Sequence, residues 1–337
     1  MKALIVNGSG MENLSVSEVA PPSISPGQVL VRNRMAGVNP IDVRSVMDPL
    51  SVRPMPREPE KARIPGAEFA GEVVEIGSGV DNLSVGDRVS VYNRVFDGTC
   101  DMCRSGNENL CRDGFILGTI SNGGFAEYSA INARNAVRIP DDLSWEMAAS
   151  LPVAALTAYH AVMRASVKGS DTCVVLGGSG NTGMFALQFA KAMGAKTIAV
   201  SRKSWLGQYG ADFTVDANGA AEFVSKLTGG AMGSVVINSL GERFWQAGLS
   251  LLGARGRLVT FGTLTGRNVG FDIMNAYTKE LAILGSTGGT MREFTELAGD
   301  SMRYKVKVWK RLGLSDGRKA LEALDSAERD GRVMLAL

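Results

Sequence analysis

A glycine-rich stretch, Gly178-Ser179-Gly180-Asn181-Thr182-Gly183, has the residue types and spacing that hold a phosphate group. It follows an apolar run at 173–176 and opens a segment, 182–193, with helical patterning. Glycines permit a tight turn and let the backbone approach a pyrophosphate, which then meets free N–H groups at the helix start. This order of strand, loop and helix predicts a dinucleotide site formed by Gly178, Gly180, Asn181, Thr182 and Gly183.

The residues after the next predicted strand, 197–200, favour NADP(H) over NAD(H). They are Ser201, Arg202 and Lys203, at a place where an enzyme that prefers NAD usually has an acidic residue. A carboxylate would repel the 2′-phosphate of NADP, whereas cationic side chains pair with it. We therefore predict that these three residues bind the cofactor.

The cysteines indicate a metal site. Three of the four, Cys100, Cys103 and Cys111, lie in one predicted loop, and Cys173 stands apart at the start of an apolar run. In a chain with no sign of secretion, clustered cysteines indicate a metal, or no function, sooner than disulfides. We expect Cys173 to be a small buried hydrophobic residue.

Two kinds of predicted element position these residues. Short Val-rich runs bounded by turn residues predict an antiparallel barrel or sandwich in the N-terminal part, with strands at 28–35, 69–76, 87–92 and 125–131. From about Leu151, strand patterns alternate with helical ones, which predicts a parallel doubly wound sheet with strands at 173–176, 197–200, 234–239, 256–262 and 281–285. A helix at 317–329 and a strand at 332–337 close the chain. The expected domains are 1–150, completed by 287–337, and 151–286.

Composition narrows the class of protein. Of 337 residues, 45% are hydrophobic, as is usual for a globular protein. The 36 basic residues almost balance the 34 acidic ones, so the net charge creates no electrostatic field that would favour binding to nucleic acid or to a membrane. No secretory signal is evident, and no apolar run reaches the roughly 20 residues of a membrane span. We expect a cytoplasmic enzyme with a small-molecule substrate. The proline-rich segment 48–63 is expected to be a surface loop, solvated or near the substrate entrance.

Two further stretches resemble the medium-chain dehydrogenase/reductases: Val38-Asn39-Pro40-Ile41-Asp42 and Pro65-Gly66-Ala67-Glu68-Phe69-Ala70-Gly71-Glu72. Zinc alcohol dehydrogenases of that family have a Cys and a His, both bound to catalytic zinc, where this chain has Asn39 and Ala67. Val153 falls near the third ligand, so the site lacks the donors that a catalytic metal needs. Residues 123–128 and 151–159 resemble the quinone oxidoreductase and enoyl reductase branches. The resemblance implies a GroES-like substrate domain, a Rossmann domain and a cleft that holds nicotinamide.

The resemblance also implies roles for individual residues. Asn39 and Thr157 would lie near the nicotinamide ribose and Ser239 on the adenosine side, while the cofactor cleft would be lined by Gly262, Gly285 and Ser286. Asn39, Asp42 and Tyr92 are candidates for substrate binding, although Asp42 and Glu68 could equally be buried structural acids. The cysteine loop resembles the structural-zinc lobe, with Asp97 in the first ligand position before Cys100, Cys103 and Cys111. That lobe implies one structural zinc per chain, with a metal-free loop as the alternative. Relatives are commonly homodimers or homotetramers.

The predicted reaction follows from the missing metal. Reduction of a simple carbonyl develops alkoxide charge that a metal or strong donor must stabilise, whereas a conjugated C=C or a quinone spreads the charge. We therefore expect an NADPH-dependent reductase of activated C=C bonds or quinones, without an assigned catalytic residue. Two alternatives remain open: a zinc alcohol dehydrogenase with ligands recruited from Asp42, Glu68 or His160, and an NADPH-binding scaffold with little turnover.

Overall fold

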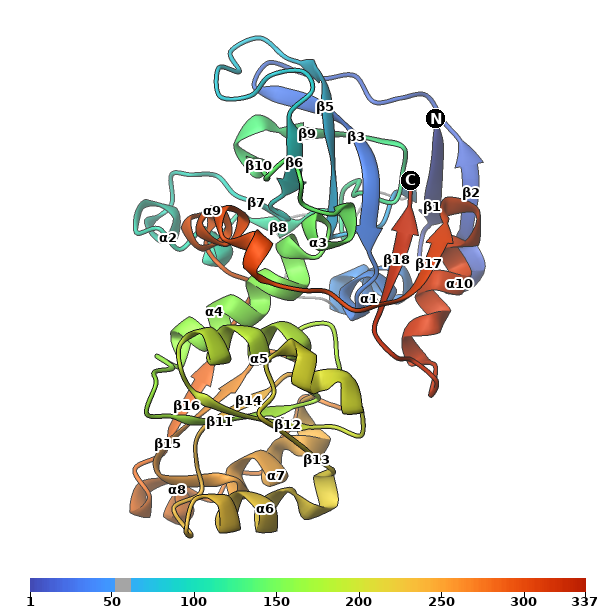
Figure 1. Cartoon of the computed structure of the whole chain (residues 1–337). Coiled ribbons are helices and arrows are strands. Elements are labelled where there is room, and N and C mark those ends of the chain that lie inside the picture. Colours follow the sequence, from blue (N-terminus) through green and yellow to red (C-terminus); the bar gives the residue numbers. More distant parts are fainter. Residues whose placement is uncertain (52–61) are drawn as a thin grey trace. The chain divides into compact units, whose positions relative to one another are not determined.

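The chain folds into two compact units, which are drawn in Figure 1. This computed structural model describes residues 1–51 and 62–337, so most of the predicted loop at 48–63 lies outside the described residues. The first unit comprises Met1–Val153 and Thr290–Leu337, and the second comprises Ala154–Gly289.

The first unit is built around a mainly antiparallel sheet. Its strands are β3 (Gln28–Gly37), β5 (Phe69–Ile76), β6 (Arg88–Val91), β9 (Tyr128–Asn132), β10 (Ala136–Arg138), β17 (Val308–Gly313) and β18 (Arg332–Ala336). They follow the order β10-β6-β5-β3-β18-β17, and β9 also pairs with β3. The alternation of Val29 and Val31 toward the interior supplies part of the core, as the period of a half-buried strand requires. The antiparallel strands predicted in this region are confirmed.

The last strand, β18, matters most for the candidate site. It lies beside β3, with Met334 opposite Gly37, and pairs in parallel with β17 on its other side. Residues about 300 positions apart in the chain therefore become neighbours. This pairing brings the start of β18 to the segment that leads from β3 into the helix α1 (Pro40–Met47).

Smaller elements complete the first unit. A second sheet has the order β2-β1-β4, and β7 pairs antiparallel with β8 in a small two-stranded sheet. The bounds of these strands are β1 (Lys2–Asn7), β2 (Leu14–Glu18), β4 (Ala62–Arg63), β7 (Arg94–Val95) and β8 (Phe115–Ile116). The helices are α2 (Asp101–Arg104), α3 (Trp145–Ala148), α9 (Met291–Gly299) and α10 (Gly317–Glu322). The helix predicted at 317–329 was too long. It continues only as a 3-10 turn to Asp325, and the chain then turns, with the Arg329 guanidinium donating to the carbonyl oxygens of Leu324 and Gly331.

The second unit confirms the predicted doubly wound sheet. Its strands, all parallel, run in the order β13-β12-β11-β14-β15-β16 and are β11 (Thr172–Leu176), β12 (Lys196–Val200), β13 (Phe213–Val215), β14 (Gly233–Asn238), β15 (Leu252–Thr260) and β16 (Ala282–Gly285). The helices are α4 (Leu156–Arg164), α5 (Gly183–Ala192), α6 (Ala220–Leu227), α7 (Trp245–Ser250) and α8 (Ile273–Thr278). Helices α4 and α5 lie on one face of the sheet, and α6 and α7 lie on the other (Figure 1). Parallel strands buried on both faces explain the continuous apolar runs of β11 and β14.

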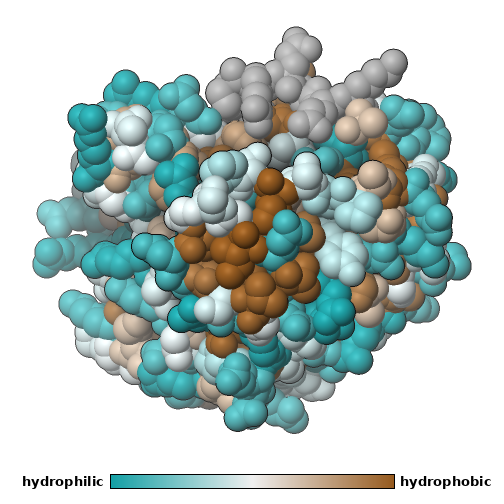
Figure 2. Space-filling model, turned by 90° about the horizontal axis from the view of Figure 1, so that it is seen from above, coloured by the Kyte–Doolittle hydropathy of each residue, from teal (hydrophilic) through white to brown (hydrophobic). Residues whose placement is uncertain are grey.

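The surface of the molecule carries one conspicuous apolar area in the view of Figure 2, where brown side chains gather among hydrophilic ones. The described residues of the first unit also line a pocket, to which Met1, Ile5, Val19, Ile64, Asn122 and Tyr128 contribute. None of the predicted site residues lines that pocket. Within residues 1–51 and 62–337, no helix has the length and apolar character needed to cross a membrane.

Candidate functional site

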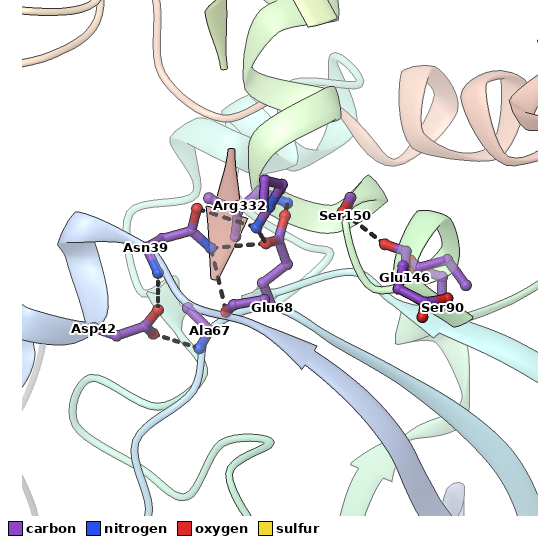
Figure 3. Close-up of polar contacts among 11 residues, drawn as sticks. Asn39, Asp42, Ala67, Glu68, Ser90, Glu146, Ser150 and Arg332 are labelled. Carbon is purple, nitrogen blue, oxygen red and sulfur yellow. Dashed lines mark hydrogen bonds and ion pairs between the residues drawn. The ribbon is translucent and has the colours of Figure 1, made fainter. Parts of the chain in front are cut away.

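Asn39 and Asp42 mark the beginning of α1 in the first unit (Figure 3). Asn39 precedes Pro40, whose fixed φ suits the first helical position. The backbone N–H of Asn39 donates to Asp42 Oδ2 over 2.8 Å, and the N–H of Ala67 donates to Asp42 Oδ1, also over 2.8 Å. Asp42 therefore fastens the helix start to the segment that enters β5.

The environment of Asp42 favours the protonated carboxyl. Burial raises the pKa of this carboxyl from its ordinary value of 3.8 to about 7, and the two backbone N–H donors and Arg332 counteract only part of that shift. The negative charge of Glu68 adds to the upward shift of the pKa. Asp42 thus carries a proton over much of the range below neutral pH.

Glu68 and Arg332 form a buried ion pair beside Asn39. Both side chains are fully buried, and Arg332 Nη2 donates to Glu68 Oε2. Glu68 Oε2 also accepts from Asn39 Nδ2 over 2.7 Å, and Glu68 Oε1 accepts from the backbone N–H of Val153 over 3.0 Å. Arg332 Nη2 donates to Asn39 Oδ1 as well, over 3.4 Å (Figure 3). A Cβ on Gly37 would lie 2.1 Å from Glu68 Oε2, so only glycine fits beside the pair.

The donor set of this cluster does not fit a catalytic metal. Ala67 and Val153 offer no side-chain ligand, and the Asn39 amide is engaged with Glu68 and Arg332. Both carboxylate oxygens of Asp42 accept backbone N–H groups. The cation that balances Glu68 is the guanidinium of Arg332. Among the described residues, the group of metal-ligating side chains close enough together to hold an ion lies elsewhere, in the cysteine loop.

The cysteine loop brings Asp97, Cys100, Cys103 and Cys111 together. One ligand atom from each lies within 4.8 Å of the others, and all the cysteines are free thiols. Cys100 Sγ and Cys111 Sγ are 4.0 Å apart, and Cys111 Sγ lies 3.1 Å from Asp97 Oδ2. Sulfurs bound to one tetrahedral zinc at about 2.3 Å would be roughly 3.8 Å apart, so the residues fit a zinc ion.

Backbone hydrogen bonds to Oδ1 of Asp97 orient this carboxylate so that Oδ2 can serve as a metal ligand. Asp97 Oδ1 accepts the backbone N–H groups of Cys100, over 2.7 Å, and of Thr99. These bonds hold the pKa of the carboxyl well below its usual range and leave Oδ2 directed at Cys111. Burial raises the pKa of the Cys103 thiol to about 12 and raises that of Cys111. Zinc binding would therefore release protons from these thiols.

The predicted phosphate loop lies between β11 and α5 in the second unit. Gly177, with φ of 71°, turns the chain after β11, and α5 begins at Gly183. A Cβ on Gly183 would lie 2.2 Å from the Gly177 carbonyl oxygen, which explains the need for glycine where helix and loop touch. The loop with Gly178, Gly180, Asn181 and Thr182 thus leads directly into the N-terminus of α5, the expected place for a pyrophosphate.

The residues predicted to select NADP lie beside this loop. Because β11 and β12 are adjacent and in register, Leu176 and Val200 end side by side. Ser201 Oγ then donates to Ser179 Oγ over 3.1 Å, and the N–H of Lys203 donates to Ser201 Oγ over 3.2 Å. The Arg202 side chain is exposed. The two loops together therefore present polar and cationic groups at one end of the sheet.

The other predicted cofactor residues follow the neighbouring strands. Ser239 comes after β14 and Gly262 after β15, while Gly285 ends β16 and the N–H of Ser286 donates to Thr260 O over 3.0 Å. All lie at the carboxyl ends of parallel strands, the edge at which such sheets bind ligands. Thr157 lies on α4, half-buried.

The sequence analysis did not predict that Tyr92 would be fully buried or that Arg332 would belong to the site. Tyr92 is fully buried in the first unit, with its ring 5.6 Å from that of Phe294, and burial raises the pKa of its hydroxyl. Its part in substrate binding stays a prediction. Arg332 was not among the predicted site residues. Its one signal was a charged residue opening an otherwise apolar final strand, Arg332–Ala336.

Comparison with known protein families supports the two-domain architecture described above. Residues 25–141 match the family model of the alcohol dehydrogenase GroES-like domain, and residues 182–302 match that of the zinc-binding dehydrogenases. The chain is an oxidoreductase with a GroES-like domain and a Rossmann domain, and it belongs to the medium-chain dehydrogenase/reductase superfamily.

Three relatives illustrate the range of that superfamily. An alcohol dehydrogenase of Geobacillus stearothermophilus is 33% identical over 91% of each chain, and the acryloyl-coenzyme A reductase of Metallosphaera sedula is 29% identical over 99% of each. The cobalt- and zinc-bound structure of a thermostable alcohol dehydrogenase from Pyrobaculum aerophilum is 37% identical, with a TM-score of 0.91 over 100% of this chain and 99% of that one.

Proposed function

We propose that this protein is an NADPH-dependent reductase that transfers hydride to activated C=C bonds or to quinones without a catalytic metal. The observation that carries the proposal is the lack of metal-binding side chains at the positions where zinc-dependent relatives have their ligands. Ala67 and Val153 are apolar, and the Asn39 amide is bonded to Glu68 and Arg332. A relative that covers 99% of the chain is described as an acryloyl-coenzyme A reductase, which supports an alkene substrate conjugated to a carbonyl.

The chain's own residues would chiefly bind and orient. The N–H groups at the start of α5 and the side chains of Ser201, Arg202 and Lys203 would hold the phosphates of NADPH. Bound NADPH supplies the hydride. A conjugated acceptor disperses the charge that develops, so orientation in a shielded site can suffice where a simple carbonyl would need a metal.

The separate cysteine loop would hold one structural zinc per chain. Its four ligands lie together, and it shares no residue with the Asn39 and Glu68 cluster. Zinc there would fix the loop and leave hydride transfer unaffected except through stability.

The direct test follows NADPH oxidation with matched acceptors, cyclohexenone beside cyclohexanone and benzoquinone as a third. We expect turnover of the enone or the quinone and none of the saturated ketone. Turnover of the saturated ketone, with two zinc ions per chain by elemental analysis, would instead indicate an alcohol dehydrogenase with unusual ligands.

That alternative is the second candidate because several relatives are described as alcohol dehydrogenases. Metal analysis separates the two proposals independently of substrate choice. One zinc per chain, lost when Cys103 is replaced by Ser, would support the metal-free reductase with a structural zinc. Tight NADPH binding without turnover of any acceptor would contradict both.

A further inference from the structure

The pocket of the first unit is not used by the proposed reaction. It has a volume of about 400 Å³, and its lining comes from β1, β4 and β9 and from the segment that follows β2. We call it the β1/β9 pocket. Pockets that bind small molecules usually measure roughly 300–1,000 Å³, so this one has the size of a ligand site. It shares no residue with the Asn39 and Glu68 cluster, the cysteine loop or the phosphate loop.

Hydrogen bonds hold the wall of the β1/β9 pocket in place. The amino group of Met1 donates to the carbonyl oxygen of Val19 over 2.7 Å, and the N–H of Val19 donates to Met1 O over 2.9 Å. On another part of the wall, the N–H of Ile64 donates to Asn122 Oδ1 over 2.8 Å, and the N–H of Gly123 donates to Ile64 O over 2.7 Å. The pocket is therefore formed before any ligand enters, and a ligand would not have to order its wall.

The lining of the β1/β9 pocket is mainly apolar and favours an uncharged ligand. Its large apolar residues are Met1, Ile5, Val19, Pro22 and Ile64. No acidic side chain is among the described residues that line it, and Arg63 is the one basic side chain there. The Arg63 guanidinium donates to the carbonyl oxygens of Gly8 and Ser45, neither of which belongs to the lining. An ion that left water for this pocket would thus find no side chain of opposite charge free to pair with it.

Two polar groups of the lining are available to a ligand. Asn122 uses its Oδ1 for the N–H of Ile64, but its Nδ2 makes no hydrogen bond to a described residue. The hydroxyl of Tyr128, which is half-buried, makes none either. An amide N–H can donate, and a phenolic hydroxyl can donate or accept. A ligand oxygen can therefore be bound at this wall, and a small number of such groups is what fixes the orientation of a ligand in an apolar pocket.

We propose that the β1/β9 pocket binds an uncharged ring compound that carries one hydroxyl or carbonyl oxygen. An apolar cavity of about 150 Å³ can hold benzene, so 400 Å³ has room for a substituted ring. The ring would pack against Ile5, Val19 and Ile64, and its oxygen would bond to the Tyr128 hydroxyl or to Asn122 Nδ2. This site does not depend on the proposed reductase activity, since it is built from other residues.

Isothermal titration calorimetry with 4-bromophenol at pH 7, where this phenol is uncharged, tests the site in solution. We expect the wild-type protein to bind it with a Kd below about 1 mM. Ile5→Trp and Val19→Trp each fill the pocket and should raise that Kd about tenfold or more. The matched control is Val85→Trp, an exposed valine of the first unit outside the lining, which should bind as the wild type does. No binding by the wild type, or an unchanged Kd in a folded Trp variant of either lining residue, would overturn the proposal.

Anomalous diffraction from the bromine provides a second measurement on the unmodified protein. After a crystal is soaked in 4-bromophenol, the bromine peak should lie in the β1/β9 pocket, among the side chains of Ile5, Val19 and Ile64. Bromine only at other places, or binding at crystal concentration only, would overturn the site.

Two related compounds test the chemical class of the ligand. Bromobenzene lacks the oxygen and 4-bromobenzoate is an anion, so both should bind several-fold more weakly than 4-bromophenol. Tyr128→Phe with Asn122→Ala should remove most of the preference for 4-bromophenol over bromobenzene. Binding of 4-bromobenzoate as tight as that of 4-bromophenol would overturn the uncharged class, because the amino group of Met1 would then recruit anions to the pocket.

Discussion

Replacement of Arg332 by Met would show whether this cation compensates the buried charge of Glu68. Both side chains are fully buried, so the change leaves a carboxylate away from water and without its guanidinium, while Asn39 Nδ2 and the Val153 N–H still donate to it. Breaking a buried pair in this way costs about 3–5 kcal/mol of unfolding free energy. Since each kcal/mol corresponds to roughly 2–4 °C in a unit of 150–250 residues, Tm should fall by about 6–20 °C.

The double variant Glu68→Gln with Arg332→Met supplies the internal comparison. It removes both charges while Gln can still meet Asn39 and the Val153 N–H, so much of the lost stability should return. A matched control is Arg303→Met, because Arg303 forms an exposed pair with Asp300 at 3.1 Å, worth about 1 kcal/mol or less.

The assay is thermal and urea unfolding followed by circular dichroism, combined as a double-mutant cycle. The reasoning would be wrong if Arg332→Met destabilised the protein no more than Arg303→Met does. It would also be wrong if the double variant were less stable than Arg332→Met alone, because Glu68 would then contribute through contacts unrelated to its charge.

Three further predictions concern pH, cofactor and metal. The pKa of the Asp42 carboxyl is raised to about 7 in the folded state, whereas its ordinary value is 3.8, so between these two pH values the folded state holds a proton that the unfolded state has lost. The stability contribution of Asp42 should therefore decline as pH rises from 4 to 7. The pH dependence of Tm should be flatter in Asp42→Asn, which cannot titrate at this position. A wild-type slope equal to that of Asp42→Asn would refute the shift. Arg202→Ala should lower kcat/KM for NADPH by about 10–100-fold and leave that for NADH nearly unchanged, since a charged hydrogen bond to phosphate is worth about 1.5–3 kcal/mol; an equal loss with both cofactors would contradict the assignment. Asp97→Ala should reduce zinc content well below one ion per chain and lower Tm, as elemental analysis and calorimetry can check, with Asp101→Ala as the neighbouring control; full zinc retention would mean that Asp97 is not a ligand.

Local patterns predicted much of the second unit. The apolar runs at 173–176 and 197–200 correspond closely to β11 and β12, and the glycine stretch lies between strand and helix as its spacing indicates. Such features can be predicted because the residues that specify a turn or a buried strand lie within about ten positions of one another in the sequence. The predicted helix at 317–329 was too long because local composition alone does not show where a helix ends. Its composition favours a helix, but the chain turns at Ser326 and the Arg329 guanidinium donates to the backbone there.

The sequence by itself determined the class of protein, the phosphate loop and the loss of the ligands that a catalytic metal would need. Only the tertiary structure decided what balances the charge of Glu68. Arg332 lies 264 positions away in the sequence and reaches Glu68 because β18 pairs with β3. Likewise, the cysteine spacing suggested a metal, but only the folded loop brings Asp97 Oδ2 to Cys111. Residue types limit the chemistry that a chain can do, whereas distances between remote residues arise from strand pairing and packing that no local pattern records.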